Sequence, residues 1–419
     1  RPWNGKTVRS HSNSRPIGAD SRQPHISSAR TDSPMRRRRV ASTAALALAA
    51  AAALLMAGCS RTSSLTSSTA GAHNSVATTA GALVDKYTAG PAFSSPGPAF
   101  DPSKARGKTV FVIPVSASVP FNTYVGKNLA TALQNFGIKA VYYSDTGEVS
   151  QWVAGMNTAI SEHVAAIDLI DVDPAVVGPQ IAQAKAAGIP VIVDHFLDTG
   201  HTSYSGYQNV AGIVGAPYKL AGQLEAAWAL KQTGGKGTFV MVQSPDSLSS
   251  TDVAIGIRAE MSKDCPTCHL VNVNVPFNDW STRMQTAVSA ALTSNPDTTY
   301  VLPVWDGMVQ YILPAITAAG RTGKVHISTY NADPFALQDL ESGNAVTMDV
   351  GESYSWLGYA LADQTLRVMT GHPPVPDEKV PVRVFTAANV GETGHPPAIN
   401  TGYGNAYLNG YKALWGLSR

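Results

Sequence analysis

Short apolar runs alternate with amphipathic stretches from about residue 107 to residue 371. The apolar runs at 110–113 and 165–170 have the length and composition of strands that are buried on both faces. Between them, Val125, Leu129 and Leu133 recur every four residues, which predicts a helix with one apolar face. The pattern predicts strands at 110–113, 139–143, 165–170, 190–194, 237–242, 269–275, 299–304 and 325–329. It predicts helices at 125–136, 152–163, 174–188, 217–233, 249–261, 280–293, 306–319 and 353–370.

This alternation is typical of α/β proteins, in which helices cover both faces of parallel sheets. The segment is long enough for two doubly wound parallel-sheet lobes, which fit it better than a single sheet. In such folds, ligands bind beyond the carboxyl ends of the strands. The loops to inspect are therefore 114–124, 143–149, 170–174, 194–209, 243–251, 304–308 and 329–333.

These loops contain many aromatic, amide and carboxylate side chains. Aromatic rings cover the C–H face of a sugar, and carboxylates and amides bind its hydroxyls, so the loops favour a small polyhydroxylated ligand. Four of the acids, Asp145, Asp173, Asp306 and Asp333, have the alternative role of capping a helix. The aromatic and amide residues are Phe121, Asn122, Tyr124, Phe196, Trp305, Tyr330 and Asn331. The other acids are Asp171, Asp194, Asp198 and Asp246.

An export signal precedes this region. Met35 is followed by four arginines and then by an uncharged run at 40–56, which predicts a signal peptide at 35–58. The sequence Ala-Gly-Cys at 57–59 resembles a bacterial lipobox, although Met56 stands where that pattern prefers Leu. The resemblance implies a lipid on Cys59. The alternative is an ordinary membrane anchor with a chance cysteine.

Two further segments flank the signal. Residues 1–34 are rich in Arg, Ser and Pro, and we expect a disordered leader or sequence upstream of the true start. Residues 59–106 are rich in Ser, Thr, Ala, Gly and Pro, which predicts a flexible tether. The tail at 391–419 has weak periodicity, so the sequence leaves open whether it packs across the hinge face or is partly disordered.

Composition and charge exclude several classes of protein. Hydrophobic residues make up 44% of the 419 residues and charged residues 14%, which excludes a wholly disordered chain. The net charge of +2 arises from residues 1–58, which carry +8 and leave −6 for the rest. A chain that is acidic after export lacks the electrostatic basis for binding nucleic acid.

Two of the three cysteines, Cys265 and Cys268, are separated by only two residues. In an exported protein this spacing favours a local disulfide. A redox-active pair is an alternative, although such pairs begin a helix and this one precedes a predicted strand. A zinc site that includes His269 would need a fourth ligand that the sequence does not supply.

The segment from Gly107 to about Asn389 resembles the type 1 periplasmic substrate-binding proteins, the ribose- and galactose-type receptors of ABC transporters. Several stretches carry this resemblance through their order and spacing. The resemblance implies two lobes that close on a sugar and are joined by a three-crossing hinge, near 209–213, 349–353 and 379–387. It implies an N-terminal lobe at 107–210 with 352–380 and a C-terminal lobe at 211–351 with 381–390. The stretches are Val119-Pro120-Phe121, 187–194, Asn295-Pro296-Asp297, Trp305-Asp306, Thr329-Tyr330-Asn331 and Gly358-Tyr359-Ala360.

The resemblance also implies site residues, with departures. Two arginines of the family pattern are replaced, one by His195 after Asp194 and one by Val253. Glu352 stands where the family has glutamine before the late helix. The loss of two cations favours a larger, less polar or cationic ligand over ribose. The expected ligand-binding residues are Phe121, Asn122, Tyr124, Asp145, Asp194, His195, Trp305, Asp306, Tyr330, Asn331 and Glu352.

We therefore expect a lipid-anchored, extracytoplasmic, monomeric receptor that captures a sugar-like ligand and delivers it to an ABC permease. A surface sensor that signals to a membrane kinase, or a receptor for a non-sugar molecule, is the alternative. The sequence contains neither a Gly-x-Ser-x-Gly elbow nor a His-Glu-x-x-His zinc helix. We expect no enzymatic activity, no cofactor and no metal.

Overall fold

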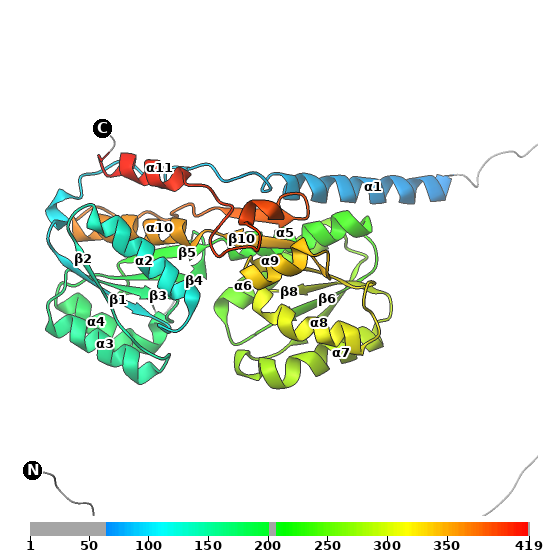
Figure 1. Ribbon diagram of the computed structural model, residues 1–419, viewed down its shortest axis with the longest axis horizontal. Helices are drawn as coiled ribbons and strands as arrows, with labels where there is room; N and C mark the ends of the chain where they lie inside the picture. The colour runs from blue at the N-terminus through cyan, green and yellow to red at the C-terminus, as the bar shows by residue number, and fades with distance from the viewer. Residues whose placement is uncertain (1–63, 201–206, 418–419) are drawn as a thin grey trace, which may run out of the picture. The chain divides into compact units, whose positions relative to one another are not determined.

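The computed structural model describes residues 64–200 and 207–417 and contains two α/β lobes (Figure 1). The N-terminal lobe has a parallel five-stranded sheet in the order β2-β1-β3-β4-β5. The strands are β1 (Thr109–Pro114), β2 (Lys139–Tyr142), β3 (Ala166–Ile170), β4 (Val191–Asp198) and β5 (Gly212–Ala216). The helices of this lobe are α2 (Pro120–Gln134), α3 (Val149–Ser161), α4 (Gly178–Ala186) and α10 (Tyr354–Met369).

The C-terminal lobe has a six-stranded sheet in the order β11-β10-β9-β8-β6-β7, in which only the edge strand β11 is antiparallel. Its strands are β6 (Thr238–Gln243), β7 (His269–Asn274), β8 (Thr298–Pro303), β9 (His326–Asn331), β10 (Val346–Glu352) and β11 (Val382–Thr386). Its helices are α5 (Tyr218–Thr233), α6 (Leu248–Asp264), α7 (Gln285–Ser294), α8 (Val309–Ala318) and α9 (Pro334–Glu341). Short helical turns lie at Ser103–Ala105, Pro174–Val177, Phe277–Asp279, Trp280–Met284, Asp306–Met308 and Val390–Thr393.

Strand β1 shows why the apolar runs form central strands. Val110 and Val112 face the core beneath α2 and α10, whereas Phe111 and Ile113 face the core beneath α3 and α4. All four side chains are buried. A central strand must be apolar on both faces because helices cover both faces of the sheet. The predicted fold class, two doubly wound parallel-sheet lobes, is confirmed.

Three strands were not predicted. Strand β5 contains two glycines, and β10 places Thr, Asp and Glu among its apolar residues, so neither has the composition of a buried strand. Strand β11 follows a proline-rich loop and includes Arg383, whose Nε donates to the carbonyl of Thr88 at 3.0 Å. Because β5 belongs to the N-terminal sheet, the predicted lobe boundary at 210/211 is wrong. The chain leaves that lobe between Ala216 and Tyr218.

The described part of the predicted tether, residues 64–106, is a packed segment, so the prediction of flexibility was wrong for it. Helix α1 (Ser64–Asp85) lies along α5 (Figure 1). Ala80 and Val84 are fully buried there, because apolar residues recur along α1 at helical spacing despite the high Ser and Thr content. Further on, the Phe93 ring packs against Trp356 of the N-terminal lobe and against Tyr411 of the C-terminal tail.

The C-terminal tail is also packed as far as residue 417, which settles the question that the sequence left open. Tyr403 stacks edge-on against Phe385 of the C-terminal lobe. Helix α11 (Ala406–Leu414) then lies over the N-terminal lobe, where Tyr411 and Trp415 are buried. Each terminal segment thus contacts both lobes.

The structure pairs Cys265 with Cys268 in a disulfide between α6 and β7. This bond lies at the amino end of β7, whereas ligands of such folds bind at the carboxyl ends. The leader at 1–34, the signal peptide at 35–58 and Cys59 lie outside the described residues. Within the described residues, no helix has the length and apolar character needed to span a membrane.

Candidate functional site

A cavity of about 610 Å³ lies where the carboxyl ends of the two sheets meet. The N-terminal lobe contributes residues that follow β1, β2 and β3, two residues near the end of β4 and the first residue of α10. The C-terminal lobe contributes residues that follow β6 to β10 and the first residue of α5. The lining residues are Val115, Ser116, Val119, Pro120, Phe121, Gly147, Asp171, His195, Phe196, Tyr218, Asp246, Ser247, Ser249, Phe277, Trp280, Trp305, Gly307, Asn331, Asp333, Glu352 and Tyr354.

His195 joins the two lobes at the base of this cavity. Its Nε2 lies 2.6 Å from Oε1 of Glu352, which ends β10 of the other lobe. Its Nδ1 lies 3.9 Å from Asp171 Oδ1. Burial alone would lower the pKa of His195, but the carboxylates of Glu352 and Asp171 outweigh burial and raise the pKa well above its ordinary value. This shift favours the protonated imidazole, in which Nε2–H donates to Glu352.

The position of His195 is fixed by its surroundings. Its backbone is left-handed, with φ at +58°. The hydroxyl of Tyr218 donates to the His195 carbonyl at 2.8 Å. The Phe121 ring lies 4.3 Å from the imidazole, centroid to centroid, and Tyr354 meets Phe121 edge-on at 4.9 Å. The imidazole is held by the neighbouring Phe121 ring and by a carboxylate from the opposite lobe.

Buried carboxylates stand behind the cavity wall on both sides. Asp194 is fully buried, and neither of its oxygens has a hydrogen-bond partner among the described residues. Burial raises the pKa of Asp194 well above its ordinary value, which favours the neutral form of this carboxyl. In the other lobe, Asp306 Oδ2 accepts from the Asp333 backbone N–H at 2.6 Å, and Tyr354 donates to Asp333 Oδ1 at 3.1 Å.

Asp306 and Asp333 share their environment with the buried Asp349. Burial, together with the neighbouring carboxylates, raises the pKa of Asp306 and Asp349 well above the ordinary value. Burial also raises the pKa of Asp333. Of these three acids only Asp333 lines the cavity, so Asp306 positions the loop that presents Asp333.

An aromatic wall covers the C-terminal side of the cavity. The rings of Trp280 and Trp305 lie 5.8 Å apart, and Phe277 lies 4.8 Å from Trp280. Trp280 Nε1 donates to Ser244 Oγ at 2.8 Å, which fixes its orientation. The Phe277 side chain is 56% exposed, so it stands at the rim. These rings offer apolar faces to a ligand between the lobes.

The structure brings five of the eleven predicted ligand-binding residues to the cavity: Phe121, His195, Trp305, Asn331 and Glu352. Their contact with a ligand stays a prediction. The other six do not line it. Asn122 is buried and donates to the Ser116 carbonyl, and Asp145 accepts from the Gly147 N–H, so both brace loops. Tyr124, Asp194, Asp306 and Tyr330 pack beside or behind the wall.

Four lining residues lie outside both the loops that the sequence singles out and its predicted ligand-binding residues. Tyr218 and Tyr354 each lie at the start of a helix that follows a crossing between the lobes. Phe277 and Trp280 follow β7 directly, and the rule that ligands bind beyond strand ends applies to this loop as well. The hydrophobic pattern instead predicts a helix that begins at Trp280, and the loop after β7 is not among the loops that it singles out.

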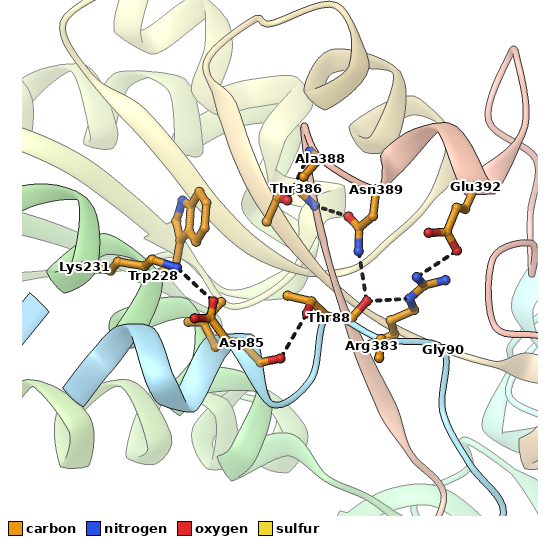
Figure 2. A pocket seen from close by; sticks show the side chains of 12 residues that line it. Asp85, Thr88, Gly90, Trp228, Lys231, Arg383, Thr386, Ala388, Asn389 and Glu392 are labelled. Atoms are coloured by element: carbon orange, nitrogen blue, oxygen red, sulfur yellow. Dashed lines mark hydrogen bonds and ion pairs between the residues drawn. The ribbon is translucent and has the colours of Figure 1, made fainter. Parts of the chain in front are cut away.

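A second pocket of about 590 Å³ lies where the end of α1 meets α5 and β11, away from the cleft (Figure 2). Its charged groups are paired with one another. Lys231 Nζ lies 2.9 Å from Asp85, and Arg383 Nη2 lies 2.8 Å from Glu392. Asn389 Nδ2 donates to the Thr88 carbonyl at 3.0 Å. These contacts fasten the N-terminal segment to the C-terminal lobe and offer a ligand few free groups.

Two α/β lobes with a cavity between the carboxyl ends of their sheets define a two-lobed protein that binds small molecules. Residues 110–373, more than half of the chain, match the model of the periplasmic binding protein domain. The chain belongs to this family.

Comparisons with individual proteins agree with that assignment. The chain is 27% identical over 236 residues to a xylitol-binding protein of Mycolicibacterium smegmatis, across 55% of this chain and 64% of that protein. The chain thus spans less than two-thirds of the length of this relative. Two solved structures of ABC transporter solute-binding proteins share its fold with TM-scores of 0.59. One, from Bacillus halodurans with bound myo-inositol, is 18% identical and is matched over 70% of this chain and 99% of its own. The other, from Actinobacillus succinogenes with bound D-allose, is 17% identical and is matched over 68% of this chain and 99% of its own.

Proposed function

We propose that the protein is an extracytoplasmic substrate-binding protein of an ABC importer that captures a sugar or polyol between its lobes. The contact between His195 and Glu352 supports this most directly, because it joins the lobes at the base of the cavity. The relatives with known ligands bind a polyol, a cyclitol and a sugar. Members of this family are binding proteins, and the proposal includes no catalytic step.

The cavity suits such a ligand in size and chemistry. Its volume lies in the range of sites that enclose a small molecule. Phe121 and Trp305 present rings from opposite lobes, and Asn331 and Glu352 supply amide and carboxylate groups beside them. Closure of the lobes about their crossings would bring these groups together on the ligand.

Thermal unfolding of the full chain, purified in detergent, tests this proposal. The panel contains pentoses, hexoses, pentitols, hexitols and inositols. A ligand at 100 times its dissociation constant adds about 2.7 kcal/mol to the folded state, which raises Tm by a few degrees. Trp305→Ala should lower the affinity at least ten-fold, and Trp228→Ala, in the second pocket, should not. No shift with any compound of the panel would contradict the proposal.

We also propose that a lipid on Cys59 anchors the protein to the outer face of the cell membrane. Support comes from the residues before Cys59, which resemble a lipobox. Cys59→Ala should move the protein from the membrane fraction to the soluble extracytoplasmic fraction. Retention of the variant in the membrane would instead favour an uncleaved signal anchor.

A further inference from the structure

Acidic side chains dominate the charge of the cavity between the lobes. Four carboxylates line it, from Asp171, Asp246, Asp333 and Glu352. Among the described lining residues there is no lysine or arginine, and His195 is the one basic group. Even a fully protonated imidazole therefore leaves the lining with a surplus of negative charge.

The lysine next to the cavity is already paired. Lys219 follows the lining residue Tyr218, but its Nζ lies 3.2 Å from Asp198 Oδ2 and 3.3 Å from Asp252 Oδ1. Its own positive charge is thus balanced by two acids outside the lining. It does not offset the acids inside the cavity.

The acids of the lining differ in how many of their carboxylate oxygens accept a hydrogen bond. Phe277 N–H donates to both oxygens of Asp246, at 3.2 and 3.1 Å, and Tyr354 donates to Asp333. Glu352 is only 2% exposed and accepts from His195 through Oε1, but its Oε2 has no hydrogen-bond partner among the described residues. A buried carboxylate oxygen without a partner is costly, and a donor on the ligand would relieve that cost.

Asp171 is the acid placed to attract a positive charge. Its side chain is 36% exposed, so its carboxyl group is accessible to a ligand at the edge of the His195–Glu352 pair. Its distance of 3.9 Å from His195 Nδ1 is too long for a hydrogen bond. Phe121 and Phe196 line the same cavity, and the faces of aromatic rings also attract an ammonium group.

We propose that the ligand of this cavity is a polyhydroxylated amine, such as an amino sugar or an amino alditol, whose ammonium group binds at Asp171 and Glu352. The inference rests on the proposed function, because it assigns the charge of the ligand that the same cleft captures. The hydroxyls of such a ligand face Asn331 and Asp333, and its C–H faces lie against the aromatic wall.

Isothermal titration calorimetry with matched compounds tests the inference on the full chain in detergent. One set contains D-glucosamine, D-glucose and N-acetyl-D-glucosamine. The other contains 1-amino-1-deoxy-D-glucitol, D-glucitol and the N-acetylated amine. In at least one set the amine should bind at least ten-fold more tightly than the hydroxyl compound, and acetylation should abolish the preference because it removes the charge. The affinity of the amine should fall as salt is added.

One variant tests where the ammonium group of the ligand binds, and a second variant is its control. Asp171→Asn keeps the size of the side chain, and asparagine tolerates the left-handed φ of +62° at this position. It should lower the affinity for the amine at least five-fold more than it lowers the affinity for the hydroxyl compound. Asp85→Asn, in the second pocket, is the matched control and should change neither.

The outcomes separate the two proposals. Equal or tighter binding of the neutral hydroxyl compounds would overturn the inference and keep the proposed function. An amine preference that survives Asp171→Asn would overturn the assignment of the ammonium site. If no member of either set binds, and no sugar or polyol of the wider panel binds, the inference and the proposed function are both overturned.

Discussion

A buried ion pair in α10 fastens both terminal segments to the N-terminal lobe, and we predict that Arg367→Met destabilises the protein strongly. Arg367 Nε lies 2.6 Å from Asp363 Oδ2, and the two side chains are 2% and 0% exposed. Arg367 Nη2 donates to the Pro98 carbonyl at 3.1 Å, and the guanidinium lies 4.4 Å from the centre of the Phe100 ring. From the other terminus, Trp415 Nε1 donates to Asp363 Oδ1 at 2.7 Å.

The magnitude follows from the charge that the substitution leaves behind. Removing one partner of a buried ion pair costs about 3–5 kcal/mol, because the other charge stays buried without compensation. The same change removes the donor to Pro98 and the contact with Phe100. A loss of this size is a large part of the stability of a typical protein. It should appear as a lower midpoint of urea unfolding followed by circular dichroism.

The loss should also depend on pH. Burial raises the pKa of Asp363, and the Arg367 charge offsets part of that rise. Without the guanidinium the folded-state pKa rises further, so the folded variant holds a proton that the unfolded chain, with its ordinary pKa of 3.8, releases. Stability of the variant should therefore fall relative to the parent as pH rises from about 4 toward the folded pKa.

Two further variants test whether burial of the ion pair explains the predicted loss of stability. Arg283→Met removes a 63% exposed arginine that pairs with Asp279 on the surface, and it should cost less than about 1 kcal/mol. Adding Asp363→Asn to Arg367→Met should restore part of the stability, because the double variant no longer buries the Asp363 carboxylate without its partner. If Arg367→Met costs no more than Arg283→Met, the pair is not buried as described and the reasoning fails.

Three further predictions concern other parts of the molecule. Gly222→Ala should cost about 1–3 kcal/mol in urea unfolding, because a methyl group there would meet the backbone of α6; a neutral effect would disprove the close approach of α5 and α6. Replacing Cys265 and Cys268 with serine should cost about 2 kcal/mol or less, given the short loop they close, without changing ligand affinity; lost affinity would contradict a purely structural bond. The pair between His195 and Glu352 has a raised histidine pKa, so its stabilisation is fully present below about pH 6.5 and is lost as pH rises through the folded pKa. His195→Gln should flatten that part of the pH dependence of Tm, and an unchanged profile would contradict the assignment.

The sequence predicted the fold well where each element follows from its own composition. Central strands are apolar on both faces, and the helices between them have one apolar face, so periodicity alone locates them. Strands β5 and β10 were not predicted from periodicity, because their neighbours in the sheet, and not their own side chains, decide their conformation. Helix α1 was not predicted because its many Ser and Thr residues obscured a narrow apolar stripe, which α5 covers.

The site was predictable only in part, because sequence position identifies the loop and not the direction of a side chain. Phe121 and Asn122 are adjacent, yet one lines the cavity and the other turns back to Ser116. In the same way, Trp305 lines the cavity, whereas Asp306 lies behind the cavity wall. Phe121 and Asn122 are consecutive residues of α2, and consecutive side chains of an α-helix point about 100° apart.

The segments that the sequence misjudged change the description of the hinge. The N-terminal segment is fixed to the C-terminal lobe as far as Thr88, whose carbonyl accepts from Arg383 and Asn389, and to the N-terminal lobe from Phe93 onward. Five Cα–Cα steps separate these two points, and an extended chain spans at most about 18 Å over that number of steps. Opening of the lobes that moves Thr88 and Phe93 farther apart must therefore release one of the two attachments. The tail repeats this arrangement between Tyr403 and Tyr407, so two additional connections beside the three crossings limit the range of lobe opening in the described part of the chain.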